Sequence, residues 1–568
     1  MNKPLLISLA AATILTSSAG AQSMYDRIQT MELQMKQMEK ELTTLKSTKS
    51  ETLAEDEEEV VADDNEAISD LEEDEEADME AGDEEDEEED EDEETLDERV
   101  DDLEESVTDL NKNTNGSHLK FGVDYRFAVD NLQYKMAGKD ASGSDTKGND
   151  ALLTNRLWIN MNWKATDNLS FTGQLAYNKT FGARSGTGYA PFETFDWIAS
   201  ENAYDDVVRV RSAYFLYKDD NFLGEDVWTF SIGRRPSTNG HLVNLRDDDV
   251  AASPMGHTIN VEFDGLSAKF GFSEITGIDG MYVKFCAGRG GTNANPKFFS
   301  IDPATSALIA SGAPYDTNGN DTPDIDLGGL IFVPYNDGQY GVATQYYYAN
   351  NLIDANLGLG QTLQGMKTVG GLHSVTANFT MNGIGDEWSD YLDDTFFFVS
   401  GAVSITDPKA DQRMLYGQFN FDGTENATGQ SKTGYSIWAG LQMPSLATED
   451  GRWGIEYNQG SEYWRSITYA EDTNIGSKLA TRGDAYEVYF TEPLVEDILS
   501  LQIRYTYIDY AYTGSNGFFG DTTGASYKIT DVQDAAAGTG PFAAGSAGLA
   551  AQTPDTAQDI RVYLRYRY

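Results

Sequence analysis

The last nine residues of the chain, IRVYLRYRY (560–568), alternate between an apolar face and a face rich in arginine. Ile560, Val562 and Leu564 share one face of an extended strand with two tyrosines, whereas three arginines lie on the other face. A water-soluble sheet can alternate in this way, but a chain seldom ends on an aromatic residue, because termini usually fray. This ending therefore predicts a strand whose apolar face meets something other than water.

The same period of two returns along most of the chain. The stretch LKFGVDYRFAV (119–129) is apolar at every second position, over the ~9–11 residues that a tilted membrane strand needs. After the N-terminal leader no apolar run approaches the ~18 residues of a spanning helix, so insertion into a membrane must use strands. Short and long connections alternate, as in outer-membrane barrels. The pattern predicts an all-β transmembrane barrel of about 16 antiparallel strands over residues 118–568.

An even number of strands returns the C-terminus to the side on which the barrel begins. To keep that parity, we take Asp264-Gly265 as a bulge within one strand rather than as a hairpin turn. The same parity places the long connection 351–369 in the periplasm. The predicted strands are 119–129, 156–164, 169–179, 207–217, 227–235, 259–272, 281–288, 340–350, 370–382, 395–406, 413–421, 434–443, 452–460, 484–492, 499–512 and 559–568.

The N-terminus predicts export from the cytoplasm. A single cation, Lys3, precedes an apolar stretch over 5–15, and small residues follow with an A-x-A cleavage site at 19–21. This order is typical of a secretory signal peptide, which we assign to residues 1–21. The chain has a single cysteine, Cys286, which excludes an intramolecular disulfide framework.

Three segments separate the signal peptide from the barrel. Residues 22–50 repeat apolar side chains at alternating spacings of four and three, which predicts a coiled coil, although a lone amphipathic helix is the alternative. Residues 51–95 are an acidic low-complexity spacer, and much of the net charge of −55 falls there. We expect this spacer to be disordered; it could alternatively gather divalent or basic partners. Residues 96–117 predict a short second coiled coil and a linker.

Basic side chains recur on the inward phase of the predicted strands, where they would line a pore. The candidates are Lys120, Arg126, Arg156, Arg209, Arg211, Arg235, Arg504, Arg561 and Arg565. Because the last strand closes against the first, Arg561 and Arg565 would stand near Arg126. Two interpretations remain open: an organised basic ladder, or an ordinary charged wall whose arginines pair with acids such as Asp124 and Glu456.

One loop segment, YDTNGNDTPDID, places oxygen-bearing side chains at Asp316, Asn318, Asn320 and Asp324. This resembles the acidic loops that fold around calcium. It departs from the EF-hand pattern, because Asp321 stands where glycine belongs and Leu327 stands where the bidentate glutamate belongs. A plain polar loop is the alternative to a calcium site.

No other motif points to a cofactor or to catalysis. The four histidines are scattered, none lies in HExxH, and the chain has no CxxCH haem-attachment motif. We therefore expect a protein that is not an enzyme, that carries no cofactor beyond the possible calcium, and that does not bind nucleic acid.

Several stretches resemble known barrels. WKATDNLSFTGQLAYN, FSIGRRP and the terminal aromatic strand are similar to Gram-negative outer-membrane porins. The stretches LATRGDAYEVYFTEPL, RYTYIDYAYTG and FFFVSGAVSITDPKADQR are similar to porin-like proteins with an N-terminal periplasmic coiled coil. The resemblance implies a barrel in the cell outer membrane whose N-terminal region lies in the periplasm. It also implies a homotrimer, and a C-terminal aromatic tag read by the barrel-assembly machinery.

The resemblance further implies that the third outer loop, 236–258, folds into the channel. Its NLRDDD segment would carry Asp247, Asp248 and Asp249 inward. These acids would face basic side chains on the wall, namely Arg126, Arg156, Arg209 and Arg211. The alternative is that the three acids stay outside in water.

Together these features favour an outer-membrane porin, an aqueous channel for passive diffusion of ions and small polar solutes. Two alternatives stay open. The coiled coil and spacer could tether the outer membrane to the cell wall through peptidoglycan. The barrel could instead act as a sheath for a separate electron-transfer protein.

Overall fold

The computed structural model describes residues 120–182, 206–223, 226–235, 238–292, 299–301, 305, 307–310, 324–357, 363–385, 388–420, 423–468, 471, 473–538 and 543–568. The predicted signal peptide, coiled coils and acidic spacer lie outside these residues. Within these ranges no helix has both the length and the apolar character needed to cross a membrane.

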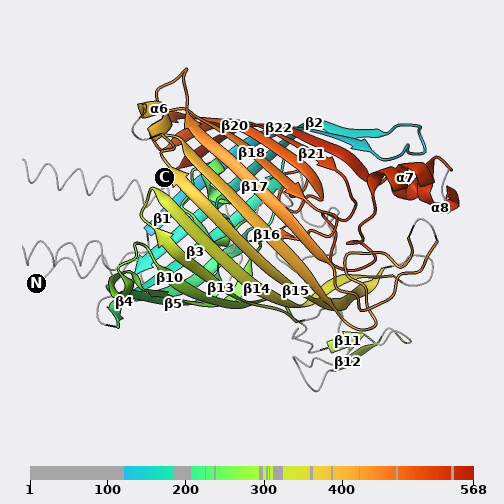
Figure 1. Ribbon diagram of the computed structural model, residues 1–568, viewed down its shortest axis with the longest axis horizontal. Coiled ribbons are helices and arrows are strands. Elements are labelled where there is room, and N and C mark those ends of the chain that lie inside the picture. The colour runs from blue at the N-terminus through green and yellow to red at the C-terminus, as the bar shows by residue number, and fades with distance from the viewer. Residues whose placement is uncertain are drawn as a thin grey trace, which may run out of the picture. The chain divides into compact units, whose positions relative to one another are not determined.

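Sixteen strands form one closed antiparallel barrel, in which each strand pairs with the next and the last closes on the first (Figure 1). They are β1 (Lys120–Met136), β2 (Thr146–Lys164), β3 (Leu169–Thr180), β4 (Arg209–Phe222), β5 (Asp226–Arg235), β9 (Phe263–Gly271), β10 (Tyr282–Gly291), β13 (Ile325–Asn336), β14 (Tyr340–Leu357), β15 (Leu363–Asn382), β16 (Phe396–Pro408), β17 (Thr433–Pro444), β18 (Arg452–Gly460), β20 (Gly483–Val495), β21 (Leu499–Tyr510) and β22 (Pro554–Arg567). The sequence prediction of an all-β barrel with sixteen strands is confirmed.

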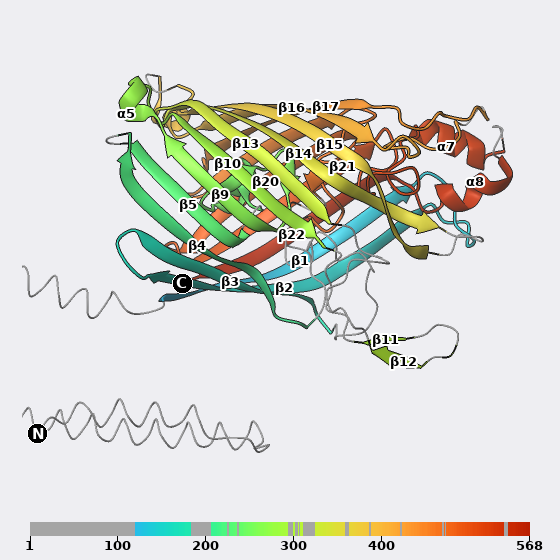
Figure 2. The same ribbon diagram turned by 90° about the horizontal axis from the view of Figure 1, so that it is seen from below.

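The remaining described elements are short and lie in the connections. They are β6 (Gly240–His241), η2 (Val243–Asp247), β7 (Ala252–Met255), β8 (Ile259–Asn260), α5 (Ser273–Thr276), β11 (Phe299–Ile301), β12 (Leu308–Ala310), α6 (Asp390–Asp393), β19 (Ile467–Thr468), α7 (Ile529–Ala536) and α8 (Ala543–Ala550). The short connections, with α5 and α6, gather at the end of the barrel where the C-terminus lies, and α7 and α8 lie at the opposite end (Figures 1 and 2). We call these the turn end and the loop end.

Alternation along each strand separates two faces of the wall. Outward side chains are apolar and exposed, for example Phe121 at 64% and Ile437 at 50%, whereas inward Arg504 is only 1% exposed. Aromatic side chains gather on the outward face in pairs such as Trp453 with Phe490, whose ring centroids are 4.7 Å apart. A face of this kind is typical of barrels surrounded by lipid.

Two strand predictions are wrong, and they cancel in the count. β13 was missed, because Gly328, Gly329 and Pro334 interrupt its alternation. The predicted strand 413–421 is instead a connection, which is held by isolated bridges such as Met414 with Gly520. β13 precedes the wrongly predicted strand in the sequence. The three strands between them, predicted at 340–350, 370–382 and 395–406, therefore cross the barrel in the direction opposite to the predicted one.

The connection predicted over 351–369 is correspondingly shorter and lies at the other end of the barrel. β14 extends to Leu357 and β15 begins at Leu363, so the connection joins the two strands at the loop end. Leu352, Ile353 and Val369 are fully buried in a hydrophobic cluster that also holds residues of distant loops. Burial against those loops explains why the pairing continues so far.

The chain through Asp264-Gly265 is a single strand, as predicted, but it contains no bulge. β9 pairs with β5 and β10 over this dipeptide without a shift in register, and it begins at Phe263 rather than at 259. Gly265 lies beside Gly233 and Gly288 on the neighbouring strands, and a Cβ atom on Gly265 would clash with the carbonyl oxygen of Ala287. Glycine is therefore required there by close backbone approach rather than by a turn.

Candidate functional site

Three connections fold back into the barrel and occupy its lumen. We call their described parts, within 238–262, 461–482 and 511–526, the plug. β8 and β19 pair in parallel, which joins the first segment to the second, and the amide of Ile467 donates to the carbonyl of Thr258 at 2.9 Å. Arg482, in the second segment, donates to the carbonyls of Thr513 and Gly524 in the third, at 2.8 and 2.9 Å. The three segments thus form one body.

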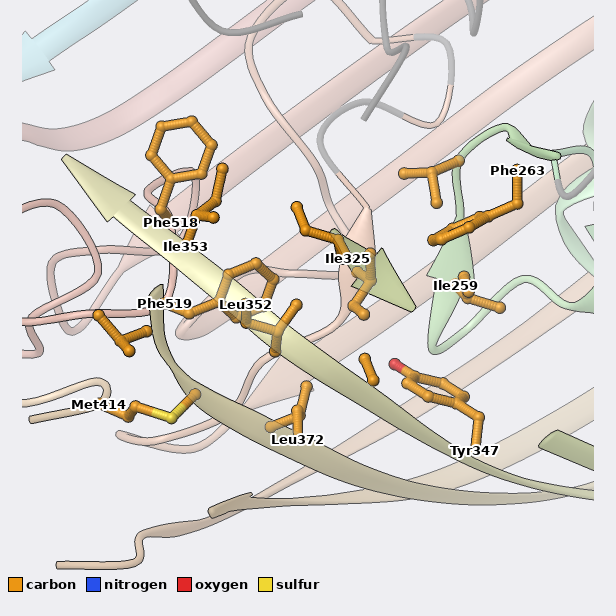
Figure 3. Close-up of a cluster of buried hydrophobic side chains, with 14 residues drawn as sticks. Ile259, Phe263, Ile325, Tyr347, Leu352, Ile353, Leu372, Met414, Phe518 and Phe519 are labelled. Carbon is orange, nitrogen blue, oxygen red and sulfur yellow. The ribbon is translucent and has the colours of Figure 1, made fainter. Parts of the chain in front are cut away.

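The plug packs on the wall through apolar side chains. Phe518, Phe519 and Ile259 of the plug share one buried cluster with Tyr347 and Leu372 of β14 and β15 (Figure 3). The hydroxyl of Tyr347 also donates to the carbonyl of Thr258 at 2.8 Å. This cluster is as well buried as the core of a soluble domain, so the lumen is filled here rather than open.

His257 fixes the first plug segment to the neighbouring strands β16 and β17. Its ring nitrogens hydrogen bond with the hydroxyls of Ser400 at 2.8 Å and Ser436 at 3.0 Å. Two tryptophans flank the ring, with centroids 5.7 Å from Trp438 and 5.6 Å from Trp464. Burial lowers the pKa of His257 to about 3, so the imidazole is neutral. His257 is therefore a buried anchor of the plug.

Arginines stand side by side across the seam where the barrel closes. Arg126 on β1 is in register with Arg156 on β2 and with Arg565 on β22. Arg504 and Arg561 are likewise in register on β21 and β22. The chain therefore places Arg561 and Arg565 beside the first strand, where the closure argument expected them.

Acidic side chains lie among these arginines. Arg565 contacts Asp124 at 2.5 Å, and Arg156 lies 3.6 Å from the same carboxylate. Arg561 contacts Asp130 at 2.5 Å. All of these side chains are buried, so both features that the sequence left open, a ladder and acid pairing, occur in the same wall.

The other basic candidates are more dispersed. Lys120 is exposed at the start of β1, and Arg209 is half-buried at the start of β4. Arg211 donates to Gln174 at 2.6 Å and lies 3.4 Å from Glu262 of the plug. Arg235 lies over the ring of Tyr214, 4.4 Å from its centroid. Arg211 adjoins the seam, because its guanidinium and that of Arg156 lie over the same ring of Trp158, 4.2 and 3.6 Å from the centroid.

The three candidate acids of the constriction loop lie within or next to η2, inside the barrel. Asp247 accepts from the hydroxyl of Tyr563 at 3.0 Å, and Asp249 contacts Arg565 at 2.8 Å. Asp248 is exposed and lies 3.7 Å from Arg567. Asp248 and Asp249 thus meet arginines of β22, whereas Asp247 meets Tyr563 of β22 and lies 3.6 Å from Arg246 of η2.

A buried charge cluster ties the plug to β20. Arg246 of η2 contacts Glu487 at 3.0 Å, and Lys478 of the second segment contacts the same carboxylate at 2.6 Å. Lys478 also contacts Glu456 of β18 at 2.6 Å. Sequence reasoning missed Arg246, Lys478 and Glu487 as a group. The available signal was an inward-facing carboxylate on a predicted strand, which needs a cation from elsewhere.

The possible calcium loop is only partly described. Asp316, Asn318 and Asn320 lie outside the described residues. Asp324 contacts Arg289 at 3.2 Å and accepts from the hydroxyl of Thr292 at 2.9 Å. Among the residues that the structure describes, no group of three or more His, Cys, Asp or Glu side chains could hold a metal ion.

Three hollows of about 880, 410 and 270 Å³ adjoin the plug toward the turn end of the barrel. The largest is lined by Arg246 and Asp248 of the plug and by residues of the turns after β15, β17 and β20. The second reaches Asp249, Arg565 and Arg567. The first segment of the plug therefore lies between these open spaces and the filled part of the lumen.

Comparisons with known proteins give one family match. Residues 146–568 match the model of a family described as "Protein of unknown function (DUF3373)". A search among curated proteins gives no match.

Several solved structures are similar to this chain at low identity. Outer-membrane expressed OmpT of Vibrio cholerae is 13% identical, with a TM-score of 0.40, over 80% of this chain and 98% of that one. The anion-selective porin from Comamonas acidovorans is 9% identical, with a TM-score of 0.40, over 79% and 99%. OprB of Pseudomonas putida is 11% identical, with a TM-score of 0.40, over 82% and 97%. At this similarity we take nothing about transport from these proteins.

Proposed function

The chain belongs to the DUF3373 family, and from the geometry of its lumen we propose that it is a narrow outer-membrane channel for ions and small polar solutes. The observation that carries the proposal is the first plug segment. It holds acids against arginines inside a closed barrel, next to hollows that open toward the turn end. Charged groups at a narrow section of a pore are what sets ion selectivity.

The outward face supports the outer-membrane location. Its exposed side chains are large and apolar on nearly every strand, as at Phe121, Phe285 and Ile437. Such a continuous belt is unfavourable in water and is favourable in lipid. Under this proposal the turn end faces the periplasm and the loop end faces the outside.

The filled lumen refines the expectation of a simple diffusion pore. An unplugged barrel of about 16 strands leaves a wide aqueous channel. Here the plug buries charged wall residues such as Arg504 and Glu487 almost completely. We therefore expect a conductance well below that of an open barrel of the same strand number, carried past η2 rather than through the barrel axis.

Assembly follows from the same proposal. We propose a homotrimer embedded in outer-membrane lipid, and recognition of the C-terminal strand by the barrel-assembly machinery. The terminal residue is held in the sheet, since the amide of Tyr568 donates to Val123 at 2.9 Å and the amide of Val123 donates back at 2.6 Å. Its side chain is exposed. Attachment to peptidoglycan, through the N-terminal region, remains a proposal that concerns residues outside those described.

Conductance measurements test the channel. The purified, detergent-folded protein is added to planar lipid bilayers, with heat-denatured protein as the control. We expect discrete small steps in current from the folded protein alone. Folded, membrane-inserted protein that produces no steps over the full range of applied voltage would overturn the proposal.

A further inference from the structure

One carboxylate on the barrel wall is shared by two segments of the plug. The Oε1 atom of Glu487 accepts from Arg246 Nη1 at 3.0 Å and from Lys478 Nζ at 2.6 Å. Its Oε2 atom accepts from the hydroxyl of Thr506 at 2.8 Å. Arg246 and Lys478 are far apart in sequence and belong to different plug segments. Glu487 is therefore the point at which both segments are fixed to the same strand.

The same region also joins the two segments to each other. Arg246 Nη2 donates to the carbonyl oxygen of Glu471 at 2.5 Å. Leu242 and Val243 of the first segment and Leu479 of the second share a buried cluster with Phe398 and Trp438 of the wall. A movement of either segment away from the wall would therefore expose the same apolar surface and break contacts to the same carboxylate.

The cluster is balanced in charge only while Glu487 is ionised. Arg246 and Lys478 supply two positive charges, and Glu487 and Glu456 supply two negative charges. Arg504 also acts on Glu487, and Asp247 lies 3.6 Å from Arg246, so this pair adds one charge of each sign. All six side chains are buried, with Glu487 and Arg246 at 1% and 2% exposure. Removing one partner from a buried ion pair is strongly unfavourable, because the remaining charge has lost both water and its counter-ion.

We propose that Glu487 is a latch: its charge holds the two plug segments in the lumen, and removing that charge by substitution releases them and widens the channel. This inference rests on the proposed channel function, of which it names the residue that keeps the channel narrow. Release would begin by breaking the contacts of Arg246 and Lys478 with Glu487, because both cations belong to the plug while Glu487 belongs to the wall.

A buried position on the plug provides a readout that does not depend on conduction. Val243 lies three residues before Arg246 and is 4% exposed. The reporter protein carries Val243→Cys in a Cys286→Ser background, so that it holds one thiol. The rate at which a small methanethiosulfonate reagent labels this thiol then measures how often the first plug segment leaves the wall.

Three variants of the reporter protein test the latch. Glu487→Gln should raise the labelling rate by about tenfold or more, because the buried cations Arg246, Lys478 and Arg504 then outnumber the remaining carboxylates Glu456 and Asp247. Glu492→Gln is the matched control on the same strand, since Glu492 accepts from the hydroxyl of Thr448 at 2.7 Å and touches no plug residue in the described contacts. It should label at the rate of the reporter protein. The pair Arg246→Gln with Glu487→Gln restores charge balance, because Lys478 keeps Glu456, and should bring the rate most of the way back.

These outcomes separate the latch from a general loss of folding and from a failure of the channel itself. A Glu487→Gln protein that labels no faster than the Glu492→Gln control overturns the latch. So does a fast rate that the added Arg246→Gln leaves unchanged. Because labelling is measured without any current, a protein that conducts nothing but shows the predicted rates would contradict the channel and leave the latch standing.

Discussion

The outward and inward faces of the same strands differ in what each residue needs. On β17 the outward Ile437 is half exposed and has no polar group to satisfy, whereas the inward Trp438 is fully buried and donates to Glu456 at 2.9 Å. Outward side chains require only an apolar surrounding. Inward side chains require specific partners, often from distant parts of the chain, as Arg246 does for Glu487 across 241 residues.

This difference separates the part of the fold that depends on neighbouring residues in the sequence from the part that depends on contacts between distant segments. The outward face follows from a period of two along each strand. The inward face is completed only when the plug is in place, because buried charges without partners are costly. Substitutions on the two faces should therefore destabilise the protein for different physical reasons.

The largest effect is expected on the inward face. Arg565→Met would leave Asp124 and Asp249 without their shared guanidinium, and the contact with Asp124 is buried. We expect a loss of about 3–5 kcal/mol in the free energy of unfolding, measured by urea titration in lipid vesicles. Arg567→Met is the matched control, since its pairs with Asp248 and Asp249 are partly exposed, and it should cost about 1 kcal/mol or less. Equal losses for the two variants would show that burial does not distinguish these pairs.

A charge on the outward face should have a somewhat smaller effect. Val403 lies on the outward face of β16, and Val403→Arg should lower the free energy of unfolding in vesicles by about 2–4 kcal/mol. Leu446→Arg, in the exposed turn after β17, should cost about 1 kcal/mol or less. If Val403→Arg is as stable as the parent, this part of the wall does not meet lipid.

The third effect is a dependence on pH that arises inside the plug. The folded-state pKa of His257 is about 3, against 6.5 in the unfolded chain, so the unfolded state binds the proton first as pH falls. Stability from the neutral ring is complete above pH 6.5 and is lost below it, at about 1.4 kcal/mol per pH unit. Between pH 6.5 and pH 4.5, the parent should therefore lose roughly 2 kcal/mol more than His257→Gln. Parallel losses in the two proteins would place the acid sensitivity elsewhere.

The wall could be predicted from sequence because its signal is local. Strands such as β3 and β18 begin and end within a residue or two of their predicted bounds. β13 was not predicted, because its glycines interrupt the alternation of apolar and polar residues. The strand predicted at 413–421 is wrong, because its apolar residues are buried by packing within a connection and not within a sheet. The two errors cancel in the number of strands, so the expectation of an even number did not expose them.

The plug could not be predicted in the same way. NLRDDD indicated acids that fold inward, by resemblance to porins, but nothing local to the sequence tells which arginines they meet. The partners of Asp249 and Arg246 lie on β22 and β20, hundreds of residues away along the chain. Lys478, in the second plug segment, follows no strand pattern at all. Such contacts depend on how loops fold together within a closed space, and composition does not carry that information.

Ion selectivity tests the central claim most directly, namely that the narrowest section lies between the first plug segment and β22. The measurement is the reversal potential in a salt gradient across a planar bilayer, for the parent and for Asp247→Asn, Asp248→Asn and Asp249→Asn combined. Neutralising these acids leaves Arg565 and Arg567 in excess over Asp124 at that section, so we predict a shift toward anions. Asp219→Asn with Asp220→Asn, near the turn after β4, should produce no shift. Unchanged selectivity of the triple variant in a conducting channel would contradict the account.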